Sequence, residues 1–263
     1  VRSAAVVVRW PRPSSYYARN GWAGRMRVDG PGGEGVWVLD SPFNNATAHY
    51  VNLMCFWSGA TFDRSAELTS VQAELYRANP IESPDTACIR AATSTGGTIL
   101  YLGTHATADV RGPDIRLRTD AATITWSGSD DTVRILPDSG VEEALPMESD
   151  VRESVMRRLR ERIADPSGFI CTLDVAGVQT LFMNGAHESS DIHTVPDEFV
   201  STSEGDGGPQ HAIADTGGTP DRCSADELMF SEAGIPWAPA GTRVNSTAYA
   251  RSAAGASSGT GGN

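Results

Sequence analysis

Lysine is absent from this chain, because all 21 of its basic side chains are arginines. A primary amine is required by the phosphate-binding lysine of P-loop proteins, by Schiff-base chemistry and by Ser-x-x-Lys acylation. The chain by itself therefore supports none of these mechanisms. A reaction that needs a lysine would have to obtain it from elsewhere.

Cysteines and long apolar runs are also scarce. The four cysteines are far apart and form no CxxC pair, so neither a zinc site nor a disulfide framework is indicated: Cys55, Cys88, Cys171 and Cys223. We expect reduced thiols, mostly in the core. No apolar stretch has membrane-spanning length, and Val1 leads directly into a strand-like run without a basic leader. These features predict a soluble, cytoplasmic protein.

Positive charge is in deficit. The net charge is -12 and the pI is about 4.8, which argues against a nucleic-acid partner because affinity for phosphate backbones comes from clustered cations. With 263 residues, 40% of them hydrophobic, the chain can bury the core of one large domain or two small ones.

The first half of the chain predicts strands at 4–10 and 35–40, separated by a polar, aromatic loop at 11–24. Ser41-Pro42 resembles a helix start, and apolar residues at helical spacing continue that helix to about Gly59. From 69 to 137, short β-branched and aromatic runs are separated by turn residues, which indicates a largely antiparallel sheet.

Two more helices are predicted, at about 148–164 and 171–186. The first is rich in arginine, and an apolar residue at every fourth position predicts a buried stripe with the arginines in solvent: Val151, Val155, Leu159 and Ile163. Residues 200–222 predict a long Gly/Asp-rich loop, and 246–263 a disordered tail.

Three motif matches lack the context that their chemistry needs. Gly30 to Gly35 fits GxGxxG but leads into a strand, whereas a dinucleotide fingerprint leaves a strand and opens a helix. Gly255 to Gly259 fits a nucleophile elbow but lies in the low-complexity tail. The Asn45 and Asn245 sequons matter only in a secreted protein. None of the three is assigned a function.

The first predicted helix carries a polar stripe. Asn45, His49 and Asn52 stand at positions i, i+4 and i+7 and so project from one helix face. An imidazole in such a stripe can act as an acid or base, or it can simply hydrogen-bond to a neighbouring strand. The spacing leaves both roles open.

The loop at 11–24 is a second candidate surface. It gathers guanidinium donors, aromatic faces and an amide: Arg12, Tyr16, Tyr17, Arg19, Asn20 and Trp22. Arginine forks bind carboxylates, and aromatic rings stack on sugar faces. The alternative is an ordinary loop anchored by its aromatic side chains.

A series of segments along residues 4–237 resembles the second domain of the Gfo/Idh/MocA oxidoreductases, a family of sugar and polyol dehydrogenases. These segments are WPRPSSYYARNGWAG, VWVLDSPFNNATAHYVNLM, TSVQAELYRANPIESPDTACIR, THATADVRGPDIRLR, CTLDVAGVQTLFMNGAHESS, HTVPDEFV and FSEAGIPWA. The resemblance implies an α+β fold in which an open, mostly antiparallel sheet packs helices on one face and commonly a partner subunit on the other. Residues 1–240 are then a single substrate-binding and dimerisation domain.

The resemblance also implies chemistry. Full-length members bind NAD or NADP in an N-terminal Rossmann domain, which also supplies a catalytic lysine; this chain resembles only the other domain. The family helix usually carries Asp-x-x-x-His-x-x-Asp, which aligns His49 with the histidine and puts Asn45 and Asn52 at the acidic positions. A second alignment, Asp40-x-x-x-Asn44, keeps the aspartate and loses the histidine, so the first is preferred.

The expectation is thus the substrate-binding half of an NAD(P)-dependent oxidoreductase of a sugar, polyol or related hydroxy compound. His49 would be catalytic, and the substrate contacts would come from Arg12, Tyr16, Tyr17, Arg19, Asn20, Trp22 and Asn45. The nicotinamide cofactor would be bound by a domain outside this chain, and no metal is expected. Homo-oligomerisation would use the open sheet face. The alternative is a non-redox carbohydrate-binding or dimerisation module that has lost the cofactor domain.

Overall fold

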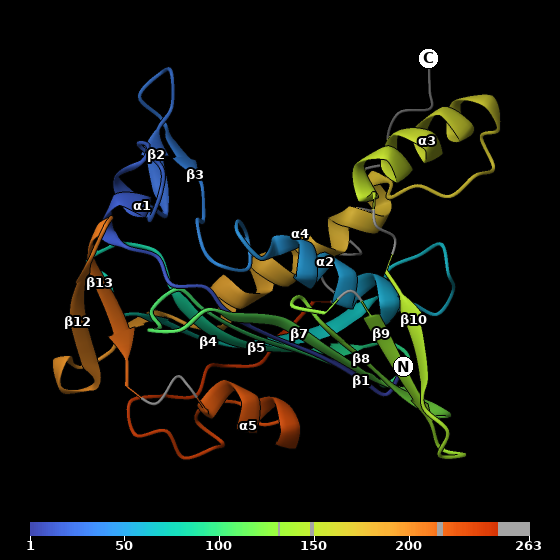
Figure 1. Ribbon diagram of the computed structural model, residues 1–263. Helices are drawn as coiled ribbons and strands as arrows, with labels where there is room; N and C mark the ends of the chain where they lie inside the picture. The colour runs from blue at the N-terminus through green and yellow to red at the C-terminus, as the bar shows by residue number, and fades with distance from the viewer. Residues whose placement is uncertain (131, 148–149, 215–217, 247–263) are drawn as a thin grey trace.

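A single large sheet organises the chain (Figure 1). The computed structural model describes residues 1–130, 132–147, 150–214 and 218–246. The strand order is β10-β9-β8-β7-β1-β6-β5-β4-β11, with β14 also paired to β4. The strands are β1 Ser3–Arg9, β4 Leu68–Arg77, β5 Thr86–Thr93, β6 Thr98–Thr104, β7 Arg111–Arg118, β8 Ala122–Ser127, β9 Thr132–Pro137, β10 Glu143–Pro146, β11 Ile192–Thr194 and β14 Val244–Asn245.

The sheet is mixed but mostly antiparallel, as the sequence predicts. The parallel pairs are β1 with β6 and β4 with β11. Strand β1 lies near the centre of the sheet, and all seven of its residues are buried. A continuous Val-rich run is the pattern expected of a strand that is covered on both faces.

The helices are α1 Ser14–Ala18, α2 Ala48–Trp57, α3 Val151–Ala164, α4 Leu173–Ser189 and α5 Thr219–Asp226, with a short 3-10 turn at Asp197–Phe199. Helices α2 and α4 lie over one face of the sheet (Figure 1). Their apolar side chains, such as Met54 and Phe182, pack there on alternate residues of the central strands. No helix within the described residues is both long enough and apolar enough to cross a bilayer.

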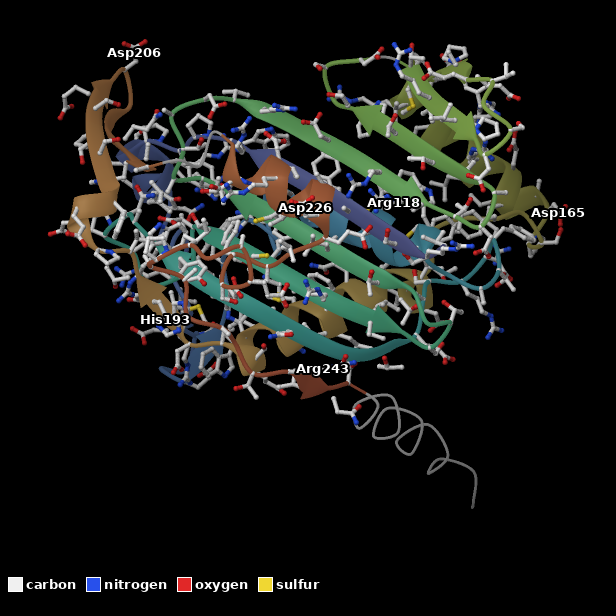
Figure 2. All side chains as sticks on the ribbon, turned by 90° about the horizontal axis from the view of Figure 1, so that it is seen from below. Arg118, Asp165, His193, Asp206, Asp226 and Arg243 are labelled. Carbon is white, nitrogen blue, oxygen red and sulfur yellow. The ribbon has the colours of Figure 1, made fainter. Side chains whose placement is uncertain are left out.

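The opposite sheet face, which the sequence analysis expects to be open, is partly covered by the chain itself. Helix α5 and the segment 227–242 run beneath the central strands (Figure 2). Met229 and Phe230 of this segment are buried against the sheet. Residues 227–242 are called the strap below. The strap and α5 occupy part of the surface that was expected to receive a partner subunit.

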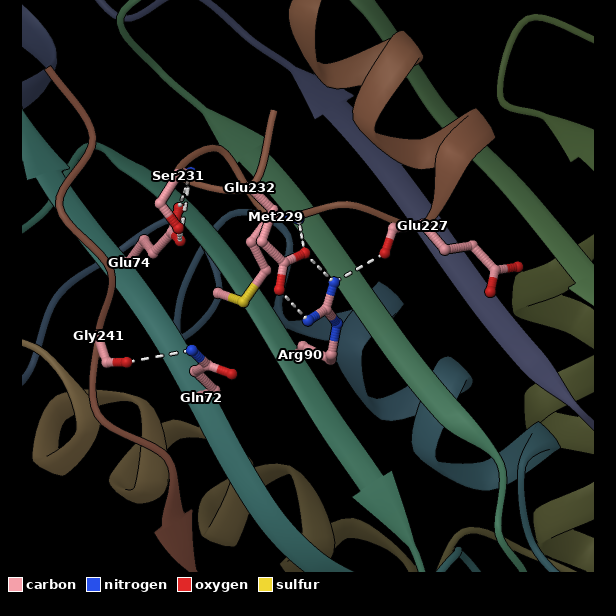
Figure 3. Close-up of polar contacts among 8 residues, drawn as sticks. All are labelled: Gln72, Glu74, Arg90, Glu227, Met229, Ser231, Glu232 and Gly241. Atoms are coloured by element: carbon pink, nitrogen blue, oxygen red, sulfur yellow. Dashed lines mark hydrogen bonds and ion pairs between the residues drawn. The ribbon is translucent and has the colours of Figure 1, made fainter. Parts of the chain in front are cut away.

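Polar contacts fix the strap to the sheet (Figure 3). Arg90 on β5 donates to both carboxylate oxygens of Glu232, at 2.7 and 2.6 Å, and to the Glu227 carbonyl at 2.7 Å. The buried Glu74 carboxylate on β4 accepts hydrogen bonds from the backbone N–H and the hydroxyl of Ser231. Burial raises the pKa of Glu74, and these hydrogen bonds oppose the increase.

The long loop predicted for 200–222 is wrong. The structure has a hairpin of β12 Val200–Gly205 and β13 Gly208–Ile213, and then the start of α5. Gly205 pairs with Gly208, so Asp206-Gly207 forms the two-residue turn. Asp-Gly between two strand-forming segments is a strong hairpin signal. The prediction of a loop gave more weight to the glycine-rich composition of the segment. Of the tail predicted for 246–263, Ser246 is instead buried and its hydroxyl donates to the Leu68 carbonyl at 2.9 Å, while residues 247–263 lie outside the described residues.

The buried stripe predicted for α3 is also wrong. Its four apolar residues are 42–76% exposed, and Ser154 is the buried residue of this helix. Helix α3 projects from the body on the side of α2 and α4 (Figure 1). The spacing of apolar residues at every fourth position correctly predicts a helix over this range, but periodicity does not determine whether a second surface covers its apolar face.

Candidate functional site

The candidate site lies where the parallel strands β1 and β6 end side by side. Arg9 at the end of β1 pairs with Thr104 at the end of β6, so the two following loops leave the same edge of the sheet. The backbone N–H of Arg12 donates to the His105 carbonyl at 3.1 Å, and the His105 ring Nδ1 lies 2.9 Å from the Trp10 carbonyl. The loop predicted for 11–24 is wrong in part, because it contains the short helix α1, which carries Tyr16 and Tyr17. The two backbone contacts with His105 hold the start of this segment in place.

His105 is a site residue that the sequence analysis missed. It is buried, and its ring centroid lies 5.9 Å from that of Tyr16. Desolvation, assisted by the nearby Arg12 charge, lowers the pKa of His105 to about 3. The imidazole is therefore neutral near pH 7. Its position directly after a β-branched run was the signal available in the sequence, but only strand pairing brings it to this loop.

Tyr16 is the centre of the cluster. Two guanidinium groups lie over its ring, with Arg19 Cζ 3.6 Å and Arg12 Cζ 4.6 Å from the ring centroid. Arg19 also lies 5.1 Å from the Trp22 ring. Cation–π contacts of this kind hold arginines in place while leaving N–H groups able to donate. The predicted grouping of these four residues is observed as a set of direct contacts.

Asn45 joins the cluster from the other side of the site. Its side-chain amide donates to Asp40 at 3.0 Å and to the Tyr16 hydroxyl at 3.5 Å. The second carboxylate oxygen of the buried Asp40 accepts from the Gly24 N–H at 2.7 Å. Asp40 therefore bridges residues 11–24 and the segment before α2. The alternative alignment, Asp40-x-x-x-Asn44, had included this aspartate.

The predicted polar stripe on the first helix is not formed as expected. Helix α2 begins at Ala48, so Asn45 lies in the preceding turns and not on the helix. The cause is local, because polar side chains form hydrogen bonds within this segment that compete with those of a helix. The Thr47 hydroxyl donates to the Pro42 carbonyl at 2.8 Å, and the Asn45 amide donates to Asp40. Asn52 instead contacts Cys171, with its Nδ2 3.9 Å from Sγ.

His49 lies on the exposed side of α2, one turn after Asn45. Within the described part of the chain it makes no hydrogen bond, ion pair or ring contact with the Tyr16 cluster. An exposed imidazole can exchange protons with a ligand or with solvent. Its catalytic role stays a prediction.

Asn20 and Tyr17, which are also predicted to contact the substrate, are placed differently from the residues described above. The Asn20 side-chain oxygen accepts from the N–H groups of Trp22 and Ala23, at 3.1 and 2.8 Å, so Asn20 stabilises the loop. Tyr17 borders a cavity of about 560 Å³, whose lining comprises Ser14, Tyr17, Ala18, Ala23, Gly24, Arg25, Asn79, Pro80, Ile81 and Glu82. Burial, and secondarily the charge of Asp85, raises the pKa of Tyr17 well above its usual value.

The Tyr17 hydroxyl is thus a protonated donor. Among the described residues its buried oxygen has no hydrogen-bond partner, and neither does the buried Nε of Arg12. An unpaired buried donor costs free energy that a ligand oxygen can recover. Together with the aromatic faces and the guanidinium groups, these atoms can recognise a hydroxylated or carboxylated compound.

The residues do not fit a nicotinamide dinucleotide. Gly30 to Gly35 forms the turn between β2 Arg27–Asp29 and β3 Gly35–Trp37, where the Gly30 N–H donates to the Glu34 carbonyl at 2.7 Å. A pyrophosphate site needs a helix N-terminus directly after such a turn. Within residues 1–130, 132–147, 150–214 and 218–246, no group of three or more His, Cys, Asp or Glu side chains could hold a metal ion.

No protein-family model matches the chain, and no curated protein matches it. Solved structures do. UDP-N-acetylglucosamine 3-dehydrogenase GnnA from Acidithiobacillus ferrooxidans is 13% identical with a TM-score of 0.51, covering 71% of this chain and 54% of that one. The WlbA dehydrogenase from Bordetella pertussis, solved with NADH and UDP-GlcNAcA, is 18% identical with a TM-score of 0.50, covering 72% and 52%.

KijD10, a 3-ketoreductase from Actinomadura kijaniata solved with TDP-benzene and NADP, is 12% identical with a TM-score of 0.50, covering 74% of this chain and 54% of that one. The chain spans about half the length of each of these proteins. At such identities the likeness concerns the fold. The chain therefore has the fold of the Gfo/Idh/MocA-type oxidoreductases, and its span fits their C-terminal domain.

Proposed function

We propose that this chain is the substrate-binding domain of an NAD(P)-dependent oxidoreductase that acts on a sugar, polyol or related hydroxy compound. The observation that carries the proposal is the Arg12–Tyr16–Arg19–Trp22 cluster at the shared end of β1 and β6, in a chain with this fold. Proteins of the same fold were solved with a nicotinamide cofactor, and one of them with a sugar nucleotide.

The proposed roles follow from the contacts. Arg12 and Arg19 donate to oxygens of the substrate, and Tyr16 and Trp22 offer faces for a sugar ring. Asn45, held by Asp40, orients a hydroxyl. His49, exposed one turn further on, accepts or returns the hydroxyl proton. The side-chain oxygen of Asn20 stabilises the loop that carries Trp22.

The cofactor belongs to a second domain in this proposal, because the residues of this chain do not form a dinucleotide site. We therefore expect residues 1–240 to bind substrate without oxidising it. The free thiols of Cys55, Cys88, Cys171 and Cys223 support a reducing, cytoplasmic location.

The first test is binding of UDP-N-acetylglucosamine and of tartrate to the 263-residue chain, measured by calorimetry and by intrinsic tryptophan fluorescence. Arg19→Gln removes one charged donor and its contacts with the Tyr16 and Trp22 rings, so affinity falls by roughly tenfold, the equivalent of about 1.4 kcal/mol. The control is Arg152→Gln on the projecting helix α3, which leaves affinity unchanged. Equal affinities for parent and Arg19→Gln would contradict the proposed site.

Turnover is tested in a chain that also carries a cofactor domain. His49→Ala should lower kcat by roughly 10²–10⁴, the usual effect of losing a general acid or base, with binding nearly intact. Unchanged turnover would make His49 structural. Binding of sugars by a protein in which no nicotinamide-dependent turnover is found would favour the non-redox binding module.

A further inference from the structure

Helix α3 carries an apolar face without a partner in the described chain. Val151, Val155, Leu159 and Ile163 recur at every fourth residue and stay 42–76% exposed. The helix stands clear of the body (Figure 1). Helices in proteins gain most of their stability by burying such a face, and exposed apolar patches of this kind mark interaction surfaces.

A second uncovered apolar surface lies on the outer strands β8 to β10. In register, Ile124 pairs with Ile135, and Val133 pairs with Leu145, so these four side chains point to one face of the sheet. Ile124 packs at the margin of the core under α2 and α4, which identifies the face. Further out on the same face, the apolar side chains are only partly covered, and Leu145 is 48% exposed.

Among the residues that the structure describes, strand β10 pairs with β9 alone, so it is an edge of the sheet. Edge strands present unpaired backbone groups, and proteins often cover them with a helix. Helix α3 lies on the correct side of the sheet for this role (Figure 1). In the described part of the chain, the apolar face of α3 instead stays exposed.

The two surfaces have opposite charge. Helix α3 has five arginines against Glu153 and Glu161, a net charge of +3. The hairpin 132–146 has Arg134 against Asp138, Glu142 and Glu143, a net charge of -2. The arginines of α3 would repel those of another α3, which disfavours helix-to-helix pairing, whereas α3 against the hairpin is attractive.

We propose that this chain forms a two-fold symmetric dimer in which α3 of each copy covers the β8–β10 face of the other. The helix and its receptor surface belong to the same chain, so two copies satisfy both surfaces and leave neither exposed. A two-fold axis makes the contact reciprocal and doubles the area buried by one helix, and stable interfaces bury about 1,200–2,000 Å² in total. Only four residues separate Pro146 from Val151; short connections favour such exchange.

The dimer is tested first by sedimentation of the full 263-residue chain. Val155→Glu places a carboxylate in the apolar contact and should raise the dimer dissociation constant by tenfold or more. Leu145→Glu on the receptor surface should do the same. The matched control is Val110→Glu, because Val110 is as exposed as these residues but lies outside both surfaces.

A cross-link then distinguishes exchange between copies from closure within one copy. Leu145→Cys and Leu159→Cys are combined with Cys171→Ser, which removes the natural exposed thiol. Oxidation should give a covalent dimer on a non-reducing gel. A covalently closed monomer, a parent chain that sediments as a monomer at all concentrations, or a dimer that Val155→Glu leaves intact would each overturn the proposal.

Discussion

The strap is the least expected part of the fold, and Phe230→Ala tests it. Phe230 is 3% exposed, and its ring centroid lies 6.2 Å from that of Tyr76 and 5.9 Å from that of Trp237. Removing a buried phenylalanine costs about 3–5 kcal/mol through lost transfer energy and the cavity left behind. The lost aromatic contacts are part of that cost.

Urea unfolding measures the effect. With a slope of about 3 kcal/mol/M, at the upper end for a domain of this size, a loss of about 4 kcal/mol lowers the midpoint by about 1.3 M. Phe62→Ala is the control, because Phe62 is 83% exposed and surface changes usually stay within about 0.5 kcal/mol. If Phe230→Ala costs less than about 1 kcal/mol, the strap is not packed on the sheet, and the burial of Phe230 against the sheet is refuted.

Other predictions concern buried polar groups. Because burial lowers the pKa of His105 to about 3, its proton binds better to the unfolded chain; stability should be full above about pH 6.5 and fall toward pH 3. His105→Asn should reduce that fall, measured as the urea midpoint between about pH 3 and pH 7. Equal dependence of the midpoint on pH in the two proteins would contradict this. The raised pKa of Glu74 gives the opposite pH dependence: its contribution to stability is lost as the pH rises through that pKa, and Glu74→Gln should remove this loss. Asp40→Ala leaves the Gly24 N–H without its acceptor and should cost about 1–3 kcal/mol of unfolding free energy; a smaller loss would mean that water replaces the carboxylate.

The sequence predicted well what depends on neighbouring residues. The Val-rich run of β1, the antiparallel runs from 69 to 137 and the helix after Thr172 form close to their expected positions. The grouping of Arg12, Tyr16, Arg19 and Trp22 was also predictable, since the four lie close together in sequence, although Tyr16 falls on the short helix α1 and not in the predicted loop. Local spacing is enough in these cases because backbone propensity and side-chain alternation act over a few residues.

Contacts between distant segments decided the rest. The parallel pairing of β1 with β6 brings His105 next to Tyr16 on α1. Tertiary packing likewise covers the second sheet face with the strap and leaves α3 uncovered. A periodic pattern specifies which side of a helix or strand is apolar, but only the complete fold specifies which surface, if any, lies opposite it.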